Sequence, residues 1–221
     1  MRCSVVRNVW LAVVLATAVW AGPFTNGSFE TVGLGVDFGV YGIATLPFGD
    51  SASIPGWVVR GTNIDYILNP PSWVGAEGSL SLDLNGSGIG GIQQSFTTQD
   101  GGRYQVTFFM AGNPDRRPRT TTLRVTAGDS SALYSFSVLQ GYSLSNMGWV
   151  ANVFEFTAES TSTTLSFWSE DDSTCNDPVS PCAFGPALDN VSVNQIIPEP
   201  GTFALFGLGL VAAGFLRRLR R

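Results

Sequence analysis

The chain has 221 residues and no histidine or lysine, so all 12 of its basic residues are arginines. Without histidine it cannot build a Ser-His-Asp triad, a Cys-His pair or a histidine-ligated zinc or haem site. Without lysine it cannot form a Schiff base or a phosphate-binding loop that ends in Gly-Lys-Ser/Thr. Any catalysis would depend on carboxylates. Charged residues make up 13% of the chain and glycines number 26, which argues against a disordered polyelectrolyte.

Residues 1–21 have the pattern of a secretory signal peptide. Arg2 and Arg7 supply the basic start, an apolar run extends from Val9 to Trp20, and Ala21 fits the last residue before a cleavage site. The alternative is a transmembrane anchor, but the run has 12 residues, and spanning a bilayer takes roughly 20. We therefore expect export and removal of this segment.

Residues 22–197 are predicted to form a single all-β domain. Apolar residues alternate with small or polar ones in seven successive segments, as in half-buried strands. The apolar positions are Leu80, Leu82, Leu84; Tyr104, Val106, Phe108, Met110; Leu123, Val125; Tyr134, Phe136, Val138; Phe154, Phe156, Ala158; Leu165, Phe167; and Val191, Val193. Turn clusters such as Asn85-Gly86 and Asp100-Gly101-Gly102 separate the segments. This spacing is typical of a β-sandwich or jelly roll.

The last 24 residues, 198–221, carry three signals in order. Pro198-Glu199-Pro200 comes first, an apolar stretch from Thr202 to Leu216 follows, and an arginine cluster ends the chain; its members are Arg217, Arg218, Arg220 and Arg221. Such a cluster stays cytoplasmic, so the body would lie outside the inner membrane. This order resembles the PEP-CTERM sorting signal of Gram-negative bacteria, which implies processing by an exosortase, a membrane transpeptidase. The alternative is a simple C-terminal anchor.

Charge is unevenly distributed along the chain. The two end segments hold six of the 12 arginines, whereas all 17 acidic residues lie between Glu30 and Glu199. Residues 22–199 therefore carry six bases against 17 acids, a net charge of −11. Nucleic acid is excluded as a partner because binding it requires a basic surface. An acidic body outside the cell attracts cations, calcium in particular.

Several phrases along the body match one family together. They are Asn26-Gly27-Ser28-Phe29-Glu30, Ile54-Pro55-Gly56-Trp57, Ile64-Asp65-Tyr66, the segment from Gly78 to Gly86, Gly91-Ile92-Gln93-Gln94-Ser95-Phe96, the segment from Phe109 to Pro114, and the segment from Gly185 to Val193. Their order and spacing resemble the bacterial "choice-of-anchor C" family, which is similar to the plant domain-of-unknown-function 642 proteins. The resemblance implies a galactose-binding-like jelly roll, the fold of many carbohydrate-binding modules, and the plant relatives are associated with cell-wall polysaccharides.

The resemblance also implies a structural calcium site. In carbohydrate-binding jelly rolls with similar first and last segments, these segments lie side by side and often hold a calcium ion. Glu30 and Asp189 would then supply two of the six to eight oxygen ligands that calcium takes. The alternative is that both carboxylates accept hydrogen bonds at the ends of strands.

Cys175 and Cys182 are the only cysteines of the predicted exported body. In an oxidising compartment we expect a disulfide between them, closing the acidic loop 170–185. A catalytic thiol would lack the histidine or lysine that holds a thiolate.

Two sets of side chains are candidates for polysaccharide contact. Arg116, Arg117 and Arg119 can pair with uronic acid carboxylates, although a solvated turn explains them as well. Among the tryptophans we expect Trp73, in the loop after Pro70-Pro71, to be exposed as a sugar platform; the alternative is a core position.

The sequence favours an exported, non-catalytic protein of the cell surface or the exopolysaccharide matrix that binds or organises extracellular polysaccharide. A purely structural surface protein without a ligand is one alternative. A carboxylate-dependent glycan-active enzyme is the other, and the sequence locates no pair of acids for it.

Overall fold

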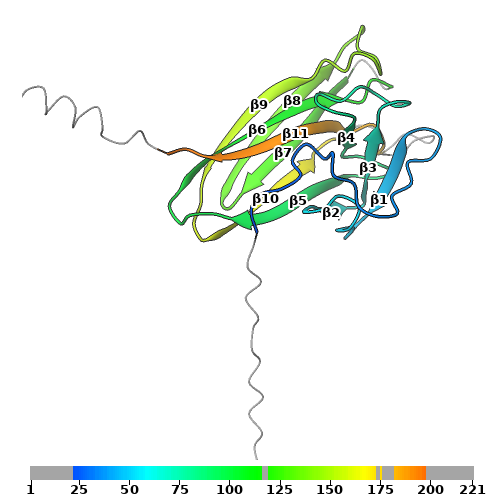
Figure 1. Ribbon diagram of the computed structural model, residues 1–221. Helices are drawn as coiled ribbons and strands as arrows, with labels where there is room; N and C mark the ends of the chain where they lie inside the picture. Colours follow the sequence, from blue (N-terminus) through cyan, green and yellow to red (C-terminus); the bar gives the residue numbers. More distant parts are fainter. Residues whose placement is uncertain (1–21, 116–118, 173–174, 176–181, 198–221) are drawn as a thin grey trace, which may run out of the picture.

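The computed structural model describes residues 22–115, 119–172, 175 and 182–197. These residues form two stacked antiparallel sheets, without a helix among them (Figure 1). The six-stranded sheet has the order β1 (Ile43–Pro47), β3 (Asn63–Leu68), β4 (Leu80–Asp83), β11 (Pro186–Gln195), β6 (Arg103–Gly112) and β9 (Val150–Thr157). The five-stranded sheet has the order β2 (Val58–Gly61), β5 (Gly90–Thr97), β10 (Ser162–Ser169), β7 (Arg119–Ala127) and β8 (Ser130–Val138). The predicted all-β sandwich is confirmed.

The core lies between the sheets because each strand turns alternate side chains inward. Phe108 on β6 meets Phe167 on β10 edge to face, with ring centroids 5.2 Å apart. Trp57 packs on Phe167 from the side and is 1% exposed. Its indole N–H donates to the Asn26 carbonyl at 2.9 Å, so the ring is buried with its polar atom paired.

Four strands, β1, β2, β3 and β5, were not among the predicted alternating segments. In β3 the residues Tyr66 and Ile67 are both buried, which breaks the alternation. In β5 two glycines replace side chains: a Cβ on Gly91 would lie 2.9 Å from the Trp168 ring and 2.5 Å from the Phe167 carbonyl oxygen. A strand can therefore lack an apolar pattern where its neighbours approach the backbone closely.

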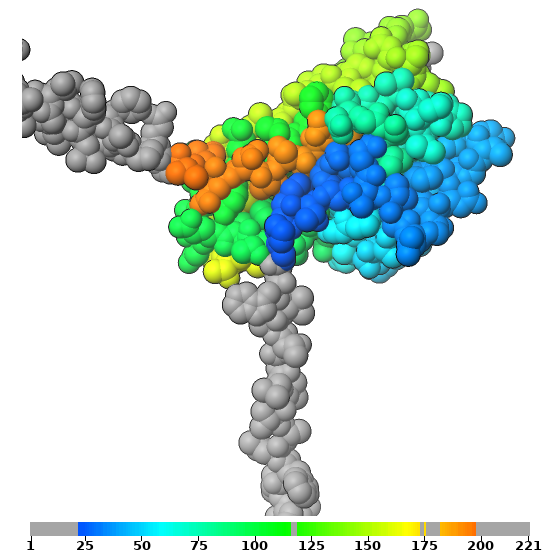
Figure 2. Space-filling view, viewed as in Figure 1, coloured from blue at the N-terminus to red at the C-terminus, as the bar shows by residue number. Residues whose placement is uncertain are grey.

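The two ends of the body meet at one end of the sandwich, which we call the tail end. There the Thr97 N–H donates to the Gly22 carbonyl at 2.7 Å, and the Ile196 N–H donates to the Arg103 carbonyl at 2.8 Å. Residues that follow Gly22 run beside β11, where the Val191 N–H donates to the Gly27 carbonyl at 2.8 Å. Figure 2 shows this first segment, in blue, lying on the surface next to β11, in orange.

No helix among the described residues is long and apolar enough to cross a membrane. The predicted signal peptide, 1–21, and the predicted sorting segment, 198–221, both lie outside the described residues.

Candidate functional site

The outer face of the six-stranded sheet contains a hollow of about 250 Å³, which we call the acidic hollow. It lies over β1, β3 and β4, beside the end of β6. Its lining residues are Tyr41, Ile43, Asp65, Ile67, Pro71, Ser72, Trp73, Asp83, Asn113, Asp115 and Leu144.

Strand alternation places two carboxyl groups on the floor of this hollow. Ile64 and Tyr66 point into the core and are fully buried, so Asp65 between them points to the outer face. The register of β3 and β4 sets Asp65 directly opposite Asp83. Directly opposed side chains have Cβ atoms roughly 4.5–5.5 Å apart, so two like charges would repel here.

Asp83 is the buried member of the pair, with 2% of its surface exposed. Its Oδ1 accepts the N–H groups of Asn85 and Gly185 at 2.9 and 2.8 Å, and its Oδ2 accepts the Asn113 side-chain amide at 2.9 Å. Burial nevertheless raises the pKa of Asp83 to about 7, and the neighbouring charge of Asp65 adds to the rise. Asp83 thus joins the ends of β4, β6 and β11 at the cost of a desolvated carboxyl group.

Asp65 is the more accessible member. Its Oδ1 accepts the Thr45 hydroxyl at 2.6 Å, and within the described part of the chain its Oδ2 has no hydrogen-bond partner. Burial raises the pKa of Asp65 from its ordinary value, and the hydrogen bond from Thr45 opposes that rise. One carboxylate oxygen therefore stays available to a ligand.

The rim of the hollow is apolar and aromatic. Tyr41 is 77% exposed, and the aliphatic side chains of Ile43 and Leu144 are also open to solvent. The Tyr41 backbone is fixed because its carbonyl accepts the Ser72 hydroxyl at 2.9 Å. An exposed ring above polar groups is the arrangement by which proteins stack on sugar rings and bind their hydroxyls.

Trp73, expected to be an exposed platform, is a wall of the same hollow and only 3% exposed. Its indole N–H donates to the Ser81 hydroxyl on β4 at 2.8 Å. The indole ring is therefore buried against the sheet, with its N–H paired. The sequence pointed to the loop that carries the hollow but not to Tyr41, whose position before β1 shows no signal by itself.

Glu30 and Asp189, the predicted calcium ligands, both hold the loop before β4. Glu30 Oε1 accepts the N–H groups of residues 79 and 80 at 2.9 and 2.7 Å. Asp189 Oδ2 accepts those of residues 76 and 77 at 2.7 and 3.1 Å. Burial raises the pKa of Asp189 to about 7, with a further contribution from the Glu30 charge.

These contacts fit a calcium shell poorly because two of the four carboxylate oxygens already accept two N–H groups each. Across the described ranges, no cluster of three or more acidic or cysteine side chains is arranged to hold a metal ion. The geometry matches the alternative reading, in which the two carboxylates accept hydrogen bonds. Calcium binding by Glu30 and Asp189 stays a prediction.

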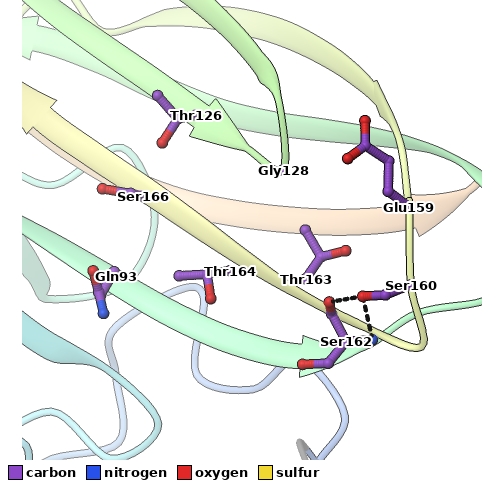
Figure 3. Close-up of a pocket in the computed structure, with 9 residues that line it drawn as sticks. All are labelled: Gln93, Thr126, Gly128, Glu159, Ser160, Ser162, Thr163, Thr164 and Ser166. Atoms are coloured by element: carbon purple, nitrogen blue, oxygen red, sulfur yellow. Dashed lines mark hydrogen bonds between the residues drawn. The ribbon is translucent and has the colours of Figure 1, made fainter.

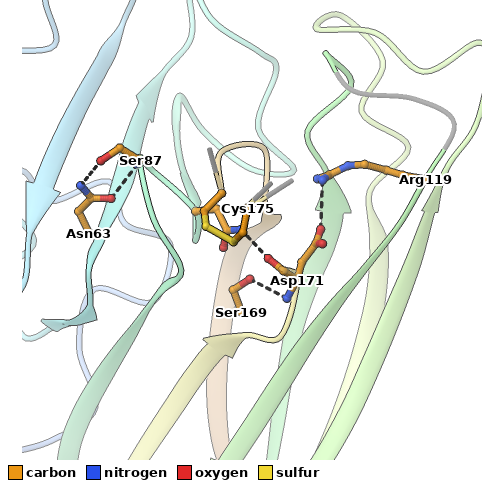
Figure 4. The surroundings of a disulfide bond; sticks show 8 residues. Asn63, Ser87, Arg119, Ser169, Asp171 and Cys175 are labelled. Atoms are coloured by element: carbon orange, nitrogen blue, oxygen red, sulfur yellow. Dashed lines mark hydrogen bonds and ion pairs between the residues drawn. A yellow bond between two sulfur atoms is a disulfide. The ribbon is translucent and has the colours of Figure 1, made fainter. Parts of the chain in front are cut away.

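The predicted disulfide between Cys175 and Cys182 is confirmed. Figure 4 shows it next to Asp171. Asp171 pairs with Arg119 at 3.1 Å, and their side chains are only 3% and 10% exposed. Arg119 is therefore part of the interior, while Arg116 and Arg117 lie outside the described residues.

Asn85 connects this ion pair to the acidic hollow. Its side-chain amide donates to the Asp171 carbonyl at 2.9 Å, and its backbone N–H donates to Asp83. Arg119 also donates to the Gly185 carbonyl at 3.4 Å, and the Gly185 N–H reaches Asp83. The disulfide loop and the floor of the hollow thus share one buried polar network, which sequence reasoning missed because its members are far apart in the chain.

The outer face of the five-stranded sheet has a second hollow, of about 450 Å³, near the tail end. Figure 3 shows that serine, threonine and glutamine side chains make up most of its lining, with Glu159 at one side. No aromatic or aliphatic rim residue belongs to it. Its hydroxyl groups pair with each other and with the backbone, as in the contact of Ser160 with the Ser162 carbonyl at 2.6 Å.

Comparison with solved structures finds carbohydrate-binding modules of similar arrangement. A family 35 module from Clostridium thermocellum has 13% identity and a TM-score of 0.43, over 70% of this chain and 98% of that one. The CBM22-1 xylan-binding domain of Paenibacillus barcinonensis Xyn10C has 14% identity and a TM-score of 0.43, over 70% of this chain and 94% of that one.

Comparison of sequences gives one curated relative and two families. Halomucin of Haloquadratum walsbyi is 32% identical over 171 residues, which are 76% of this chain but 2% of halomucin. The PEP-CTERM protein-sorting motif matches residues 197–221, as predicted from the tail. The family described as a protein of unknown function, DUF642, matches residues 22–194. The chain therefore belongs to the DUF642 family and ends in a PEP-CTERM sorting motif.

Proposed function

We propose that this exported protein binds extracellular polysaccharide through the acidic hollow, without catalysing a reaction on it. The observation that carries the proposal is that an exposed Tyr41 ring lines the same hollow as the carboxyl groups of Asp65 and Asp83 and the amide of Asn113. The ring can cover the C–H face of a sugar while the floor accepts its hydroxyl hydrogens. The hollow of about 250 Å³ is smaller than the roughly 300–1,000 Å³ of drug-sized sites, which suits one sugar unit of a chain.

Binding is favoured over hydrolysis because Asp83 is fully engaged. A glycosidase needs two carboxyl groups that face the scissile bond, one of them free to donate a proton. Both oxygens of Asp83 already accept hydrogen bonds from the protein, and only 2% of the residue is exposed. Of the two opposed floor carboxyl groups, Asp65 alone keeps an oxygen without a partner in the described part of the chain; Asp115, the third carboxyl group of the lining, lies in the loop after β6.

The hollow and the start of the tail lie at opposite ends of β6. Arg103, at the start of β6, pairs with Ile196, the residue two places before Pro198. Asn113, just past the other end of β6, lines the hollow. Ten strand residues at roughly 3.3 Å each separate the two by about 30 Å. The hollow would therefore lie at the far end of β6 from the residues that lead into the tail.

The binding proposal is tested with the full-length protein, purified in mild detergent, in pull-downs with insoluble polysaccharides and with exopolysaccharide, with and without calcium. Wild type should be retained on at least one polysaccharide, and Tyr41→Ala should reduce retention about tenfold. Thr164→Ala, on the opposite sheet, should bind like wild type. Lack of retention on every polysaccharide would favour a purely structural surface protein, and measurable turnover of a bound glycan would favour an enzyme.

We further propose that an exosortase processes the tail while it lies in the inner membrane, and that the body then reaches the cell surface or the matrix. Replacing Pro198-Glu199-Pro200 by three alanines should leave an unprocessed precursor in the membrane fraction. Intact-mass measurement of the exported protein checks this. The same mature C-terminus in wild type and variant would exclude processing through this motif.

A further inference from the structure

The described lining of the acidic hollow is one-sided in charge. Asp65, Asp83 and Asp115 contribute carboxyl groups, and no described basic side chain lines it. Arg119 approaches from below but is directed into the interior by its ion pair with Asp171. Among the described residues, a ligand in the hollow therefore meets three carboxyl groups and no arginine; Arg116 and Arg117, which follow Asp115, lie outside them.

Low solvent exposure makes this charge effective. Asp83 is 2% exposed, and Trp73, which stands beside it, is 3% exposed. Charges that water cannot reach are screened far less than charges on an open surface. A ligand carboxylate would be repelled by ionised Asp65, and by Asp83 in the molecules in which Asp83 is ionised, whereas a ligand ammonium would be attracted.

The hydrogen-bonding groups of the hollow also favour an uncharged or amine-bearing ligand. Asp65 Oδ2 is an acceptor without a partner in the described part of the chain. The Asn113 side chain donates one N–H to Asp83, and its amide oxygen accepts the Asp115 backbone N–H, so the strongest polar contacts of this residue are made within the protein. The free Asp65 oxygen can accept sugar O–H and N–H groups, but it cannot donate to a ligand carboxylate.

We infer that the acidic hollow takes a sugar unit that is uncharged or carries an amine, and that it discriminates against uronic acids. This rests on the proposed polysaccharide binding and differs from the expectation that Arg116, Arg117 and Arg119 pair with uronates; of these only Arg119 is described, and it pairs with Asp171. Selectivity of this kind comes from repulsion of the wrong ligand as much as from attraction of the right one.

Three oligosaccharides of equal length test the inference: a fully deacetylated chito-oligosaccharide, its N-acetylated counterpart and an oligogalacturonate. Each is titrated into the full-length protein in detergent at neutral pH, and heat of binding is recorded at two salt concentrations. We expect the amine-bearing and neutral ligands to bind and the uronate to bind at least tenfold more weakly. The disadvantage of the uronate should shrink at the higher salt concentration.

Asp65→Asn is the diagnostic variant, and Glu155→Gln is its matched control. Both remove one negative charge from the outer face of the six-stranded sheet, but Glu155 lies on β9, where it pairs with Arg103 and is not part of the hollow. Asp65→Asn should reduce the preference for the amine over the uronate about tenfold or more. Glu155→Gln should leave that preference unchanged.

Two results overturn the inference in different ways. Uronate binding as tight as that of the other two ligands, and lost in Tyr41→Ala, would refute the selectivity while leaving the binding proposal intact. Equal effects of Asp65→Asn and Glu155→Gln would show that the net charge of the sheet, and not the hollow, sets the preference. If none of the three ligands nor any polysaccharide in the pull-downs binds, the proposed function itself fails and this inference fails with it.

Discussion

In both sheets alternate side chains point outward, but the two outer faces carry different kinds of polar side chain. On the five-stranded sheet the outward positions are mostly serine and threonine, and they pair across strands, as Ser95 does with Thr164 at 2.7 Å. On the six-stranded sheet the outward positions of β3 and β4 hold the carboxyl groups of Asp65 and Asp83 under an aromatic rim. Two opposed hydroxyl groups can hydrogen-bond to each other, whereas two opposed ionised carboxyl groups repel each other.

The six-stranded sheet therefore contains an energetically unfavourable arrangement, the buried carboxyl group of Asp83. Burying a carboxyl group costs free energy unless hydrogen bonds offset it. Asp83 has such bonds, yet burial still raises its pKa to about 7. Asp189, on the neighbouring β11, shows the same rise for the same reason. Strongly perturbed carboxyl groups inside a hollow mark a functional candidate, and the hydroxyl face offers no counterpart.

The largest expected effect follows from removing the Asp83 carboxyl group. Asp83→Ala would leave the N–H groups of Asn85 and Gly185 and the Asn113 amide without their acceptor in the interior. At about 1–3 kcal/mol for each unsatisfied group, and without full additivity, we expect a loss of about 3–5 kcal/mol in the free energy of unfolding. Chemical denaturation with urea measures it.

Ser95→Ala is the matched control on the other face. It removes one exposed hydroxyl, and its partner Thr164 can turn to water, so the free energy of unfolding should change by less than about 0.5 kcal/mol. Similar losses in the two variants would mean that Asp83 does not hold the strand ends together.

A pH titration of stability tests the two buried carboxyl groups of the six-stranded sheet, Asp83 and Asp189. The folded pKa values of Asp83 and Asp189 are both raised to about 7 from 3.8, so the folded state binds more protons than the unfolded state between these values. The contribution of both groups to stability is therefore fully present below about pH 4 and is lost as the pH rises through 7. We expect the melting temperature to fall between pH 5 and pH 8, and to fall less in Asp83→Asn. A rise over this interval would contradict the prediction.

The disulfide supports the network from below the hollow. Replacing Cys175 and Cys182 by serine reopens a loop with a sequence separation of 7 residues. On the chain-entropy model this should lower the free energy of unfolding by about 2–3 kcal/mol. Hydrogen exchange should quicken first at the N–H groups of Asn85 and Gly185, and much less on β7 and β8. Wild type treated with reductant should behave like the double variant, and uniform quickening across both sheets would show that the loop does not act locally.

Sequence reasoning recovered the strands whose alternation is regular and the two cysteines, because period-2 patterns and an oxidised pair are local signals. It missed β5, where Gly90 leaves room for the Asn63 carbonyl and Gly91 leaves room for Trp168. It also missed the hollow, because Tyr41, Asp65 and Asp115 are brought together only by strand order β1-β3-β4-β11-β6. Trp73 was expected at the surface because its loop is rich in proline, but its ring is buried in the hydrophobic cluster and its indole N–H is paired with Ser81.

The last prediction concerns the hollow on the five-stranded sheet, which resembles a binding surface but lacks an aromatic or aliphatic rim. We expect only small effects of substitutions there, on stability and on polysaccharide retention. Thr164 and Ser166 line the hollow of the five-stranded sheet. Replacing both by alanine should shift the free energy of unfolding by less than about 1 kcal/mol, since exposed substitutions typically change it by less than about 0.5 each. It should also leave polysaccharide retention within twofold of wild type. Hydroxyl groups on an open sheet exchange bonds with water at little net gain, so without a ring to exclude water this hollow should bind sugar weakly. A loss of retention as large as that in Tyr41→Ala would move the binding surface to the five-stranded sheet and make the acidic hollow a purely structural feature.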